Sequence, residues 1–178
     1  MVAALLAAAV ISACSASPAI NTGPLGSAGD GFFSQCSPAS PGQTVTMGIW
    51  WLHNDGTSPV TVQSVHLGGR NLRITRPWLL PIYHNLSNGQ FDAVGVSLSY
   101  PPTTGRGIPA SAALSIWDER QPADGGVIRP GQTLNLVFGM TRTSATAGRA
   151  GGPVIVYSAG GTTYNLAEKT AETLVTNC

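Results

Sequence analysis

The amino-acid sequence predicts an all-β protein, folded as a two-sheet antiparallel sandwich. Several short segments alternate between apolar and polar residues, which is the pattern of half-buried strands. The 22 glycines and 13 prolines fall largely between these segments, as turns do. Helix signals are poor throughout, and the best candidate, residues 165–173, is short enough to be interpreted as a loop with one helical turn. About seven to nine short strands separated by turns are typical of a sandwich.

The composition of the chain excludes several classes of protein. The 178 residues include 9 Lys or Arg and 8 Asp or Glu, for a net charge of +1. Such a balance does not supply the basic field that nucleic acid or an anionic membrane surface needs as its main attraction. An apolar content of 43% with only 10% charged residues also excludes an intrinsically disordered chain. The length fits one domain, which can carry a long insertion.

The first strand of the domain is expected at residues 44–52. Alternation places Val45, Met47, Ile49 and Trp51 on the core face, so Trp50 points to the outer face. The sequence Asn54-Asp55-Gly56 then predicts a turn, and residues 60–67 predict the strand that returns beside the first as a hairpin. The apolar parity slips between Val62 and Val65, which indicates a bulge near Gln63 and Ser64.

The C-terminal third holds the clearest strand, residues 133–142, in which Leu134, Leu136, Phe138 and Met140 alternate with smaller or polar residues. Strands at residues 154–158 and 162–166 flank a tight Gly160-Gly161 turn, and residues 173–178 form the last strand. This ending resembles the last hairpin of immunoglobulin-like domains found in small exported bacterial lipoproteins. The resemblance implies an immunoglobulin-like sandwich, although the Cys-Trp-Cys arrangement of antibody domains is missing.

The N-terminus predicts export. Residues 3–11 form an unbroken apolar run that is too short to span a bilayer and is typical of a secretory signal. The run ends in Ile11-Ser12-Ala13-Cys14, which resembles the bacterial lipobox. That resemblance implies that residues 1–13 are removed and that Cys14 carries lipid, which anchors the protein on the extracytoplasmic face of the cell membrane. The alternative is a buried N-terminal apolar helix with an incidental cysteine.

Two cysteines then remain, and export would bring them to an oxidising compartment. Cys36 and Cys178 are therefore expected to form a disulfide. A metal site or a catalytic thiol are the alternatives, but the sequence contains no CxxC motif and no basic neighbour beside Cys178. Residues 14–30, rich in Ser, Ala, Pro and Gly, are expected to be a flexible tether, and residues 31–178 a single domain.

Residues 68–124 are longer than one sandwich connection requires. An outward Trp50 is either covered, with residues 79–83 packed over it, or exposed as a platform together with Trp78, Arg73 and Arg76. Such a platform would suit sugar rings or a partner protein.

No motif for catalysis, metal or cofactor binding stands out. The histidines His53, His66 and His84 have no metal-ligand spacing, and no GxSxG or phosphate loop occurs. We expect a non-catalytic, membrane-anchored domain without cofactor that binds or scaffolds an envelope protein or glycan, and that binds no nucleic acid. The competing hypothesis is an extracytoplasmic enzyme or metal protein that uses residues 68–124 as an active-site wall. A histidine beside a carboxylate in a cleft would favour chemistry, and an exposed aromatic surface would favour binding.

Overall fold

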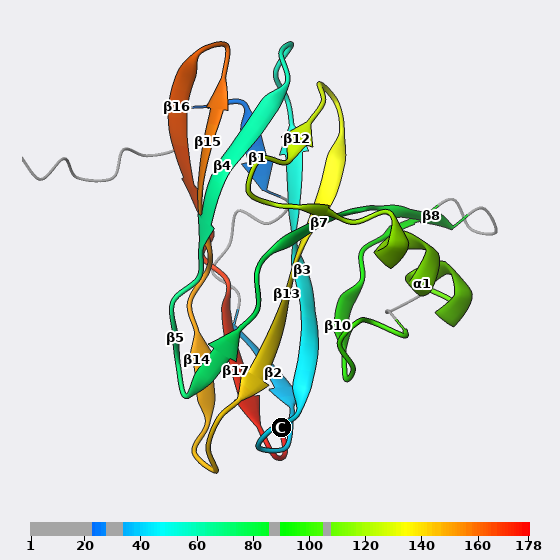
Figure 1. Ribbon diagram of the computed structural model, residues 1–178, viewed down its shortest axis with the longest axis vertical. Coiled ribbons are helices and arrows are strands. Elements are labelled where there is room, and N and C mark those ends of the chain that lie inside the picture. The colour runs from blue at the N-terminus through cyan, green and yellow to red at the C-terminus, as the bar shows by residue number, and fades with distance from the viewer. Residues whose placement is uncertain (1–22, 28–33, 86–89, 105–107) are drawn as a thin grey trace, which may run out of the picture.

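The protein is a two-layer, immunoglobulin-like β-sandwich (Figure 1), which confirms the predicted fold class. The computed structural model describes residues 23–27, 34–85, 90–104 and 108–178. One layer is a seven-stranded sheet with the central order β1-β3-β13-β7-β11, in which β10 also pairs with β3 and β6 with β13. These strands are β1 (Leu25–Ser27), β3 (Thr44–Asn54), β6 (Leu72–Ile74), β7 (Trp78–Pro81), β10 (Gly95–Ser97), β11 (Gln121–Pro122) and β13 (Thr133–Arg142).

The second layer consists of two four-stranded sheets that lie end to end in Figure 1. The upper sheet has the order β12-β4-β15-β16, and the lower one β2-β17-β14-β5. The upper strands are β12 (Val127–Ile128), β4 (Val60–His66), β15 (Val154–Ala159) and β16 (Thr162–Ala167). The lower strands are β2 (Ser34–Pro38), β17 (Ala171–Val175), β14 (Gly148–Ala150) and β5 (Gly69–Arg70). All ladders are antiparallel except β2 with β17, which is parallel and departs from the predicted purely antiparallel sandwich.

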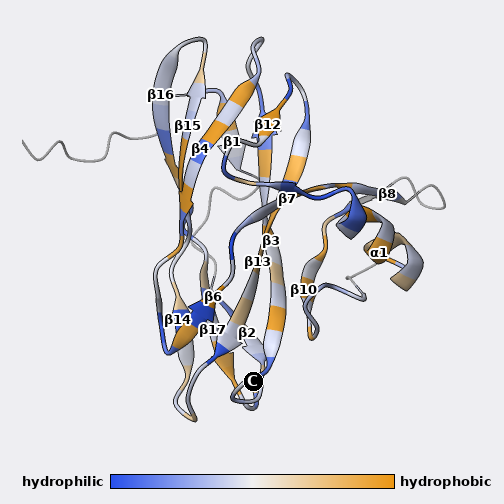
Figure 2. Ribbon diagram, viewed as in Figure 1, coloured by the Kyte–Doolittle hydropathy of each residue, from blue (hydrophilic) through white to orange (hydrophobic). Residues whose placement is uncertain are grey.

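The main core lies between the layers. The inward residues of β3 and β13 in one layer pack there against those of β4 and β15 in the other. Figure 2 shows apolar and polar residues alternating along β4, as a strand with one buried face requires. In β13 nine of the ten residues are buried, on both faces of the strand. A second apolar cluster covers its outer face and contains Val137 together with Leu80, Val94, Ile108, Ala113, Ile116 and Trp117.

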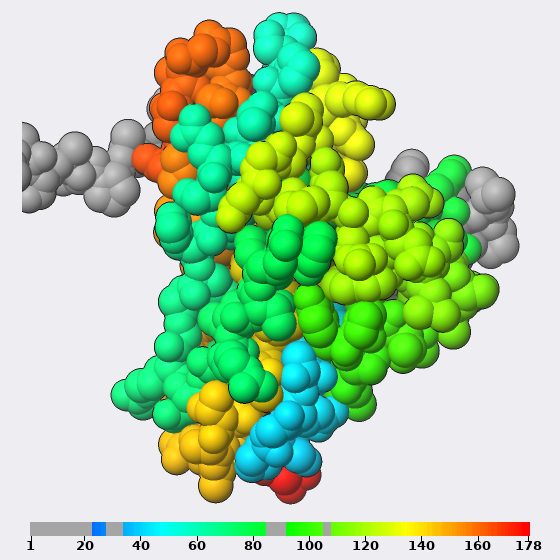
Figure 3. Space-filling model, in the orientation of Figure 1, coloured from blue at the N-terminus to red at the C-terminus, as the bar shows by residue number. Residues whose placement is uncertain are grey.

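That second cluster is supplied mainly by residues 68–124, which are an integral part of the sandwich. They contribute β6, β7, β10 and β11 to the main sheet, the hairpin of β8 (Tyr83–Asn85) and β9 (Gln90–Asp92), and helix α1 (Ala110–Asp118). In Figure 3 the later part of this segment, with β8 to β10 and α1, stands out from the sandwich on the right. The sequence analysis was wrong to expect no helix here. It was also wrong at residues 165–173, because residues up to Ala167 continue β16 and β17 begins at Ala171.

The predicted pairing of residues 44–52 with 60–67 is wrong. Both strands exist, but β3 belongs to the main sheet and β4 to the opposite layer. The buried side chain of Asn54 forms the arch between them: its Nδ2 donates to the carbonyls of Ser58 and Ile128, at 2.9 Å each. The bulge at Gln63 is confirmed, because Ser64 pairs with Val156 while Val62 pairs with the next residue, Tyr157. The hairpin of β15 and β16 with its Gly160-Gly161 turn is also confirmed.

The folded domain begins before residue 31. Residues 25–27, which lie within the predicted tether, form β1 and pair with the end of β3. Leu25 is fully buried in the main core, and its backbone N–H donates to the Tyr157 hydroxyl at 3.3 Å. The expected signal sequence, residues 1–13, and Cys14 lie outside the described residues.

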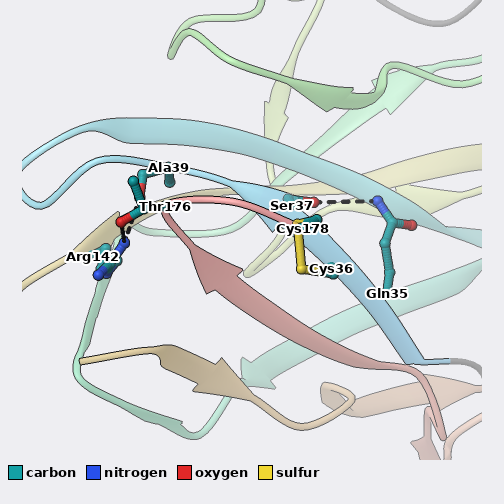
Figure 4. The surroundings of a disulfide bond; sticks show 7 residues. All are labelled: Gln35, Cys36, Ser37, Ala39, Arg142, Thr176 and Cys178. Carbon is teal, nitrogen blue, oxygen red and sulfur yellow. Dashed lines mark hydrogen bonds between the residues drawn. A yellow bond between two sulfur atoms is a disulfide. The ribbon is translucent and has the colours of Figure 1, made fainter. Parts of the chain in front are cut away.

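The expected disulfide is confirmed between Cys36 and Cys178, with a Cα–Cα distance of 5.9 Å (Figure 4). A second fastening lies nearby. The buried guanidinium of Arg142 donates from Nη1 to the Ala39 carbonyl (2.8 Å) and to the Thr176 hydroxyl (2.9 Å). Its other nitrogens donate to backbone carbonyls of residues 144–146. The C-terminal strand is thereby joined both to β2 and to the turn after β13.

Candidate functional site

A bulge in β3 decides which of the two adjacent tryptophans faces the core. Trp50 pairs with Leu136 and Met47 with Phe138, so three steps along β3 match two steps along β13. The extra residue reverses the parity of everything that follows it. Trp50 therefore points inward, is only 1% exposed, and meets the Phe138 ring edge to face at 5.5 Å. The predicted outward Trp50 is wrong, and Trp51 is the tryptophan on the outer face.

Asn135 holds this bulge. Its side-chain Nδ2 donates to the carbonyls of Gly48 (2.7 Å) and Trp50 (3.0 Å), and its Oδ1 accepts from the Val94 N–H (3.1 Å). A Cβ at Gly48 would lie 2.8 Å from that Oδ1, so the contact requires glycine. A fully buried asparagine in the centre of an apolar strand is the signal that the sequence offered for this feature.

The outward Trp51 lines a pocket of about 460 Å³. Its other walls are the end of β7, the residue after it, and the turn that enters β13. These walls are formed by Pro81, Ile82, Gly131, Gln132, Thr133 and Leu134. The size and the largely apolar lining with a few polar groups are those of a small-molecule site.

A chain of polar side chains stands at the pocket. Thr133 is the cross-strand partner of His53, and its hydroxyl lies 2.7 Å from His53 Nδ1. On the other side of the ring, His53 Nε2 lies 3.3 Å from Asp55 Oδ1. The side chains of His53 and Asp55 are 38% and 69% exposed, so solvent reaches both. The sequence offered His53 as a possible metal ligand or as the partner of a carboxylate in a cleft; its partner is Asp55, which is largely exposed and not enclosed in a cleft.

Of the residues predicted to form a platform, Trp78 and Arg76 come together, away from Trp50. The Arg76 guanidinium lies 4.3 Å from the Trp78 ring centroid, and the Arg120 guanidinium lies near both Trp78 (5.0 Å) and Trp117 (4.7 Å). Trp78 Nε1 also donates to the Tyr100 hydroxyl at 3.0 Å. These contacts join α1 to the edge of the main sheet. Arg76 thus covers Trp78, while Trp50 lies in the core, so the two tryptophans do not form one platform.

Arg73 lies elsewhere, in β6 opposite Thr141, and the ring contacts of the described residues do not include it. His66 shares a 3.1 Å hydrogen bond with Ser64, and His84 lies in β8. Over the described ranges, no group of three or more His, Cys, Asp or Glu side chains is placed to hold a metal ion. Within those ranges, likewise, no helix is long and apolar enough to cross a membrane.

Two acidic side chains, the half-buried Glu168 and the buried Glu172, lie near the break between the two sheets of the second layer. Burial raises the pKa of Glu172 to about 7, and the neighbouring Ser37 side chain opposes that rise in part. Burial also raises the pKa of Glu168, against a smaller opposite effect of Ser27. Glu172 is fully buried. This carboxyl group is a cost to the folded state once it is ionised.

No protein-family model and no curated protein sequence matches the chain. Among solved structures, the chain is similar to the ASH / PapD-like domain of human CEP192 (PapD-like domain 7), with 11% sequence identity and a TM-score of 0.42. The match covers 97% of this chain and 96% of that one.

Proposed function

We propose that the protein is an exported lipoprotein, anchored through Cys14, whose sandwich is a non-catalytic binding domain with its ligand site at Trp51. The observation that carries the binding role is the pocket, in which an outward indole and aliphatic side chains stand beside the Thr133 hydroxyl. Pockets of this make-up bind the apolar body of a ligand and orient it through a few polar groups.

Two observations support export and anchoring. The Cys36–Cys178 disulfide belongs with an oxidising compartment, where such bonds persist. The segment Ile11-Ser12-Ala13-Cys14 supplies a lipidation motif. An extended chain spans at most about 3.5 Å per residue. The segment from Cys14 to Gly23 therefore allows the domain to stand up to roughly 30 Å from its anchor.

Membrane fractionation tests the anchor. Cys14→Ser, or globomycin treatment of cells expressing the native chain, should release the protein from the membrane fraction. A Cys36→Ser variant serves as the matched control and should stay in the membrane. Retention of the Cys14→Ser protein would refute the anchor without touching the binding role.

A fragment screen tests the pocket. Small aromatic and alicyclic fragments are added to isotopically labelled protein, and the indole N–H signal of Trp51 is followed by NMR. We expect shifts at Trp51 and Thr133, and none at the core residue Trp50. A screen whose hits all shift residues outside the pocket would refute the proposed site.

The second candidate function is hydrolysis with Thr133 as nucleophile, because the side chains of Thr133, His53 and Asp55 stand in a row. In the serine-hydrolase arrangement, His Nε2 faces the nucleophile and a buried carboxylate holds Nδ1. Here Nδ1 faces Thr133, and Asp55 is exposed. Activity toward p-nitrophenyl esters that disappears in Thr133→Val would establish this function in place of non-catalytic binding.

A further inference from the structure

We propose that the Trp51 pocket binds an N-acetylhexosamine unit of a β-linked glycan and that the Thr133 hydroxyl selects its amide N–H. The inference rests on the proposed function, since it names the ligand class of the same pocket. The side chains of Thr133, His53 and Asp55 determine whether the Thr133 hydroxyl donates or accepts a hydrogen bond at the pocket.

The direction of this hydrogen bond follows from the carboxylate. Asp55 Oδ1 lies 3.3 Å from His53 Nε2, and a carboxylate at that distance favours the tautomer with hydrogen on Nε2. A neutral imidazole with hydrogen on Nε2 has a bare Nδ1, which can only accept. The Thr133 hydroxyl must then donate to Nδ1 across 2.7 Å. Its oxygen is left with lone pairs, so toward the pocket Thr133 is an acceptor and requires a donor on the ligand.

Gln132 has the opposite polarity. Its carboxamide oxygen accepts from the Arg129 backbone N–H at 2.9 Å, so the Nε2 group is the part of this side chain that can donate to a ligand. The pocket thus combines an acceptor at Thr133 with a donor one residue away. An acetamido group presents the matching pair, an N–H and a carbonyl oxygen.

The remaining walls match the rest of such a ligand. The flat indole of Trp51 suits the C–H face of a pyranose ring, and the side chains of Pro81 and Ile82 suit the acetyl methyl. The lining contains no Lys or Arg, and the nearest charge in the chain of polar groups is the carboxylate of Asp55. Both facts favour a neutral sugar over a phosphate or a uronic acid.

Calorimetric titration with chitotriose, three β-linked N-acetylglucosamine units, tests the inference. Cellotriose is the matched control, because it has the same ring faces and linkage but lacks the acetamido group. We expect chitotriose to bind at least tenfold more tightly than cellotriose. Thr133→Val, which keeps the shape of the side chain, should weaken chitotriose binding about tenfold and reduce its advantage over cellotriose.

One further variant tests the aromatic wall. Trp51→Phe keeps an aromatic wall and should weaken both sugars. Melting curves identify any variant that fails to fold.

Equal affinity for the two sugars, or a Thr133→Val variant that binds chitotriose as well as the native protein, would overturn the acetamido assignment. Failure of chitotriose to bind would also overturn it. If fragments still shift Trp51 in that case, the proposed binding function stands and only its ligand class falls.

Discussion

Glu172 should make the protein less stable as the pH rises through neutrality. Its pKa lies near 7 in the folded protein, against 4.5 for an ordinary glutamate carboxyl group such as that of the unfolded chain. Below pH 4.5 both states hold the proton, and the stability is complete. Between 4.5 and 7 the folded state holds a proton that the unfolded chain has released, so unfolding becomes easier with each increment of pH. Above 7 the carboxylate is ionised in both states, and the full penalty remains.

Each pH unit in this window changes the free energy of unfolding by about 1.4 kcal/mol. Over the window from 4.5 to 7, the loss amounts to about 3 kcal/mol. That is a large share of the roughly 5–15 kcal/mol that stabilises an ordinary domain. Glu168, whose pKa is raised by burial too, adds a loss in the same direction.

Urea denaturation at pH 4.5, 6, 7 and 8 measures the effect in the native protein and in Glu172→Gln. The amide carries no charge at any of these pH values, so the variant should lose less stability between pH 4.5 and 8, by about 2–3 kcal/mol. Glu119→Gln removes a charge from an exposed side chain and should follow the native curve. Parallel curves for the native protein and Glu172→Gln would refute the reasoning, whatever the absolute offset between them.

Four further changes probe the packing. Asn135→Ala leaves two carbonyls and one N–H unpaired at the bulge and should cost about 3 kcal/mol in urea denaturation; a cost below about 1 kcal/mol would mean that the bulge holds itself. Trp50→Ala should cost about 3–5 kcal/mol by the same assay, as for a core tryptophan, whereas an exposed platform would lose almost nothing. Replacing Cys36 and Cys178 together by Ser should lower the stability by up to about 5 kcal/mol, and adding reductant to the native protein should reproduce the loss. Arg142→Met should cost about 3 kcal/mol, and unchanged denaturation would show that water replaces its hydrogen bonds.

The alternating residues of β13 and the Gly160-Gly161 turn were sufficient to predict their strands, because local patterning dominates where one strand face is strongly apolar. The Gln63 bulge was predictable for the same reason, since apolar parity breaks visibly there. The disulfide followed from cysteine number. These features depend on residues that are neighbours in the chain.

The errors arose where distant residues decide the outcome. Alternation along β3 could not reveal the bulge, because the partner that fixes it, Asn135, lies far away in sequence. The same limit applied to the arch at Asn54, whose side chain reaches Ile128. Helix α1 did leave a local signal: Ala113, Ile116 and Trp117 recur at helical spacing. That segment is only nine residues long, and apolar residues in so short a run also fit a strand.

The candidate site was hidden by one of these errors. With Trp51 assigned to the core, the pocket had no aromatic wall, and His53 had no visible neighbour across the strand. Thr133 became its neighbour only through the register of β3 against β13. The composition of the site therefore depends on the one-residue bulge in β3. This bulge sets the register of β3 against β13, and the sequence does not display it.

The disulfide also has a mechanical consequence. It closes residues 36–178 into one covalent ring and leaves β1 outside that ring. A pull applied to the N-terminal segment therefore loads β1 first, which is held by three residue pairs with β3, by the Leu25–Tyr157 hydrogen bond and by the burial of Leu25. Once β1 has detached, the force passes to Cys36, and the sulfur bridge prevents the ring from being drawn out to its full length. β1 would thus detach before the strands inside the ring carry the load. Its release would remove Leu25 from the core while the other strands stay linked.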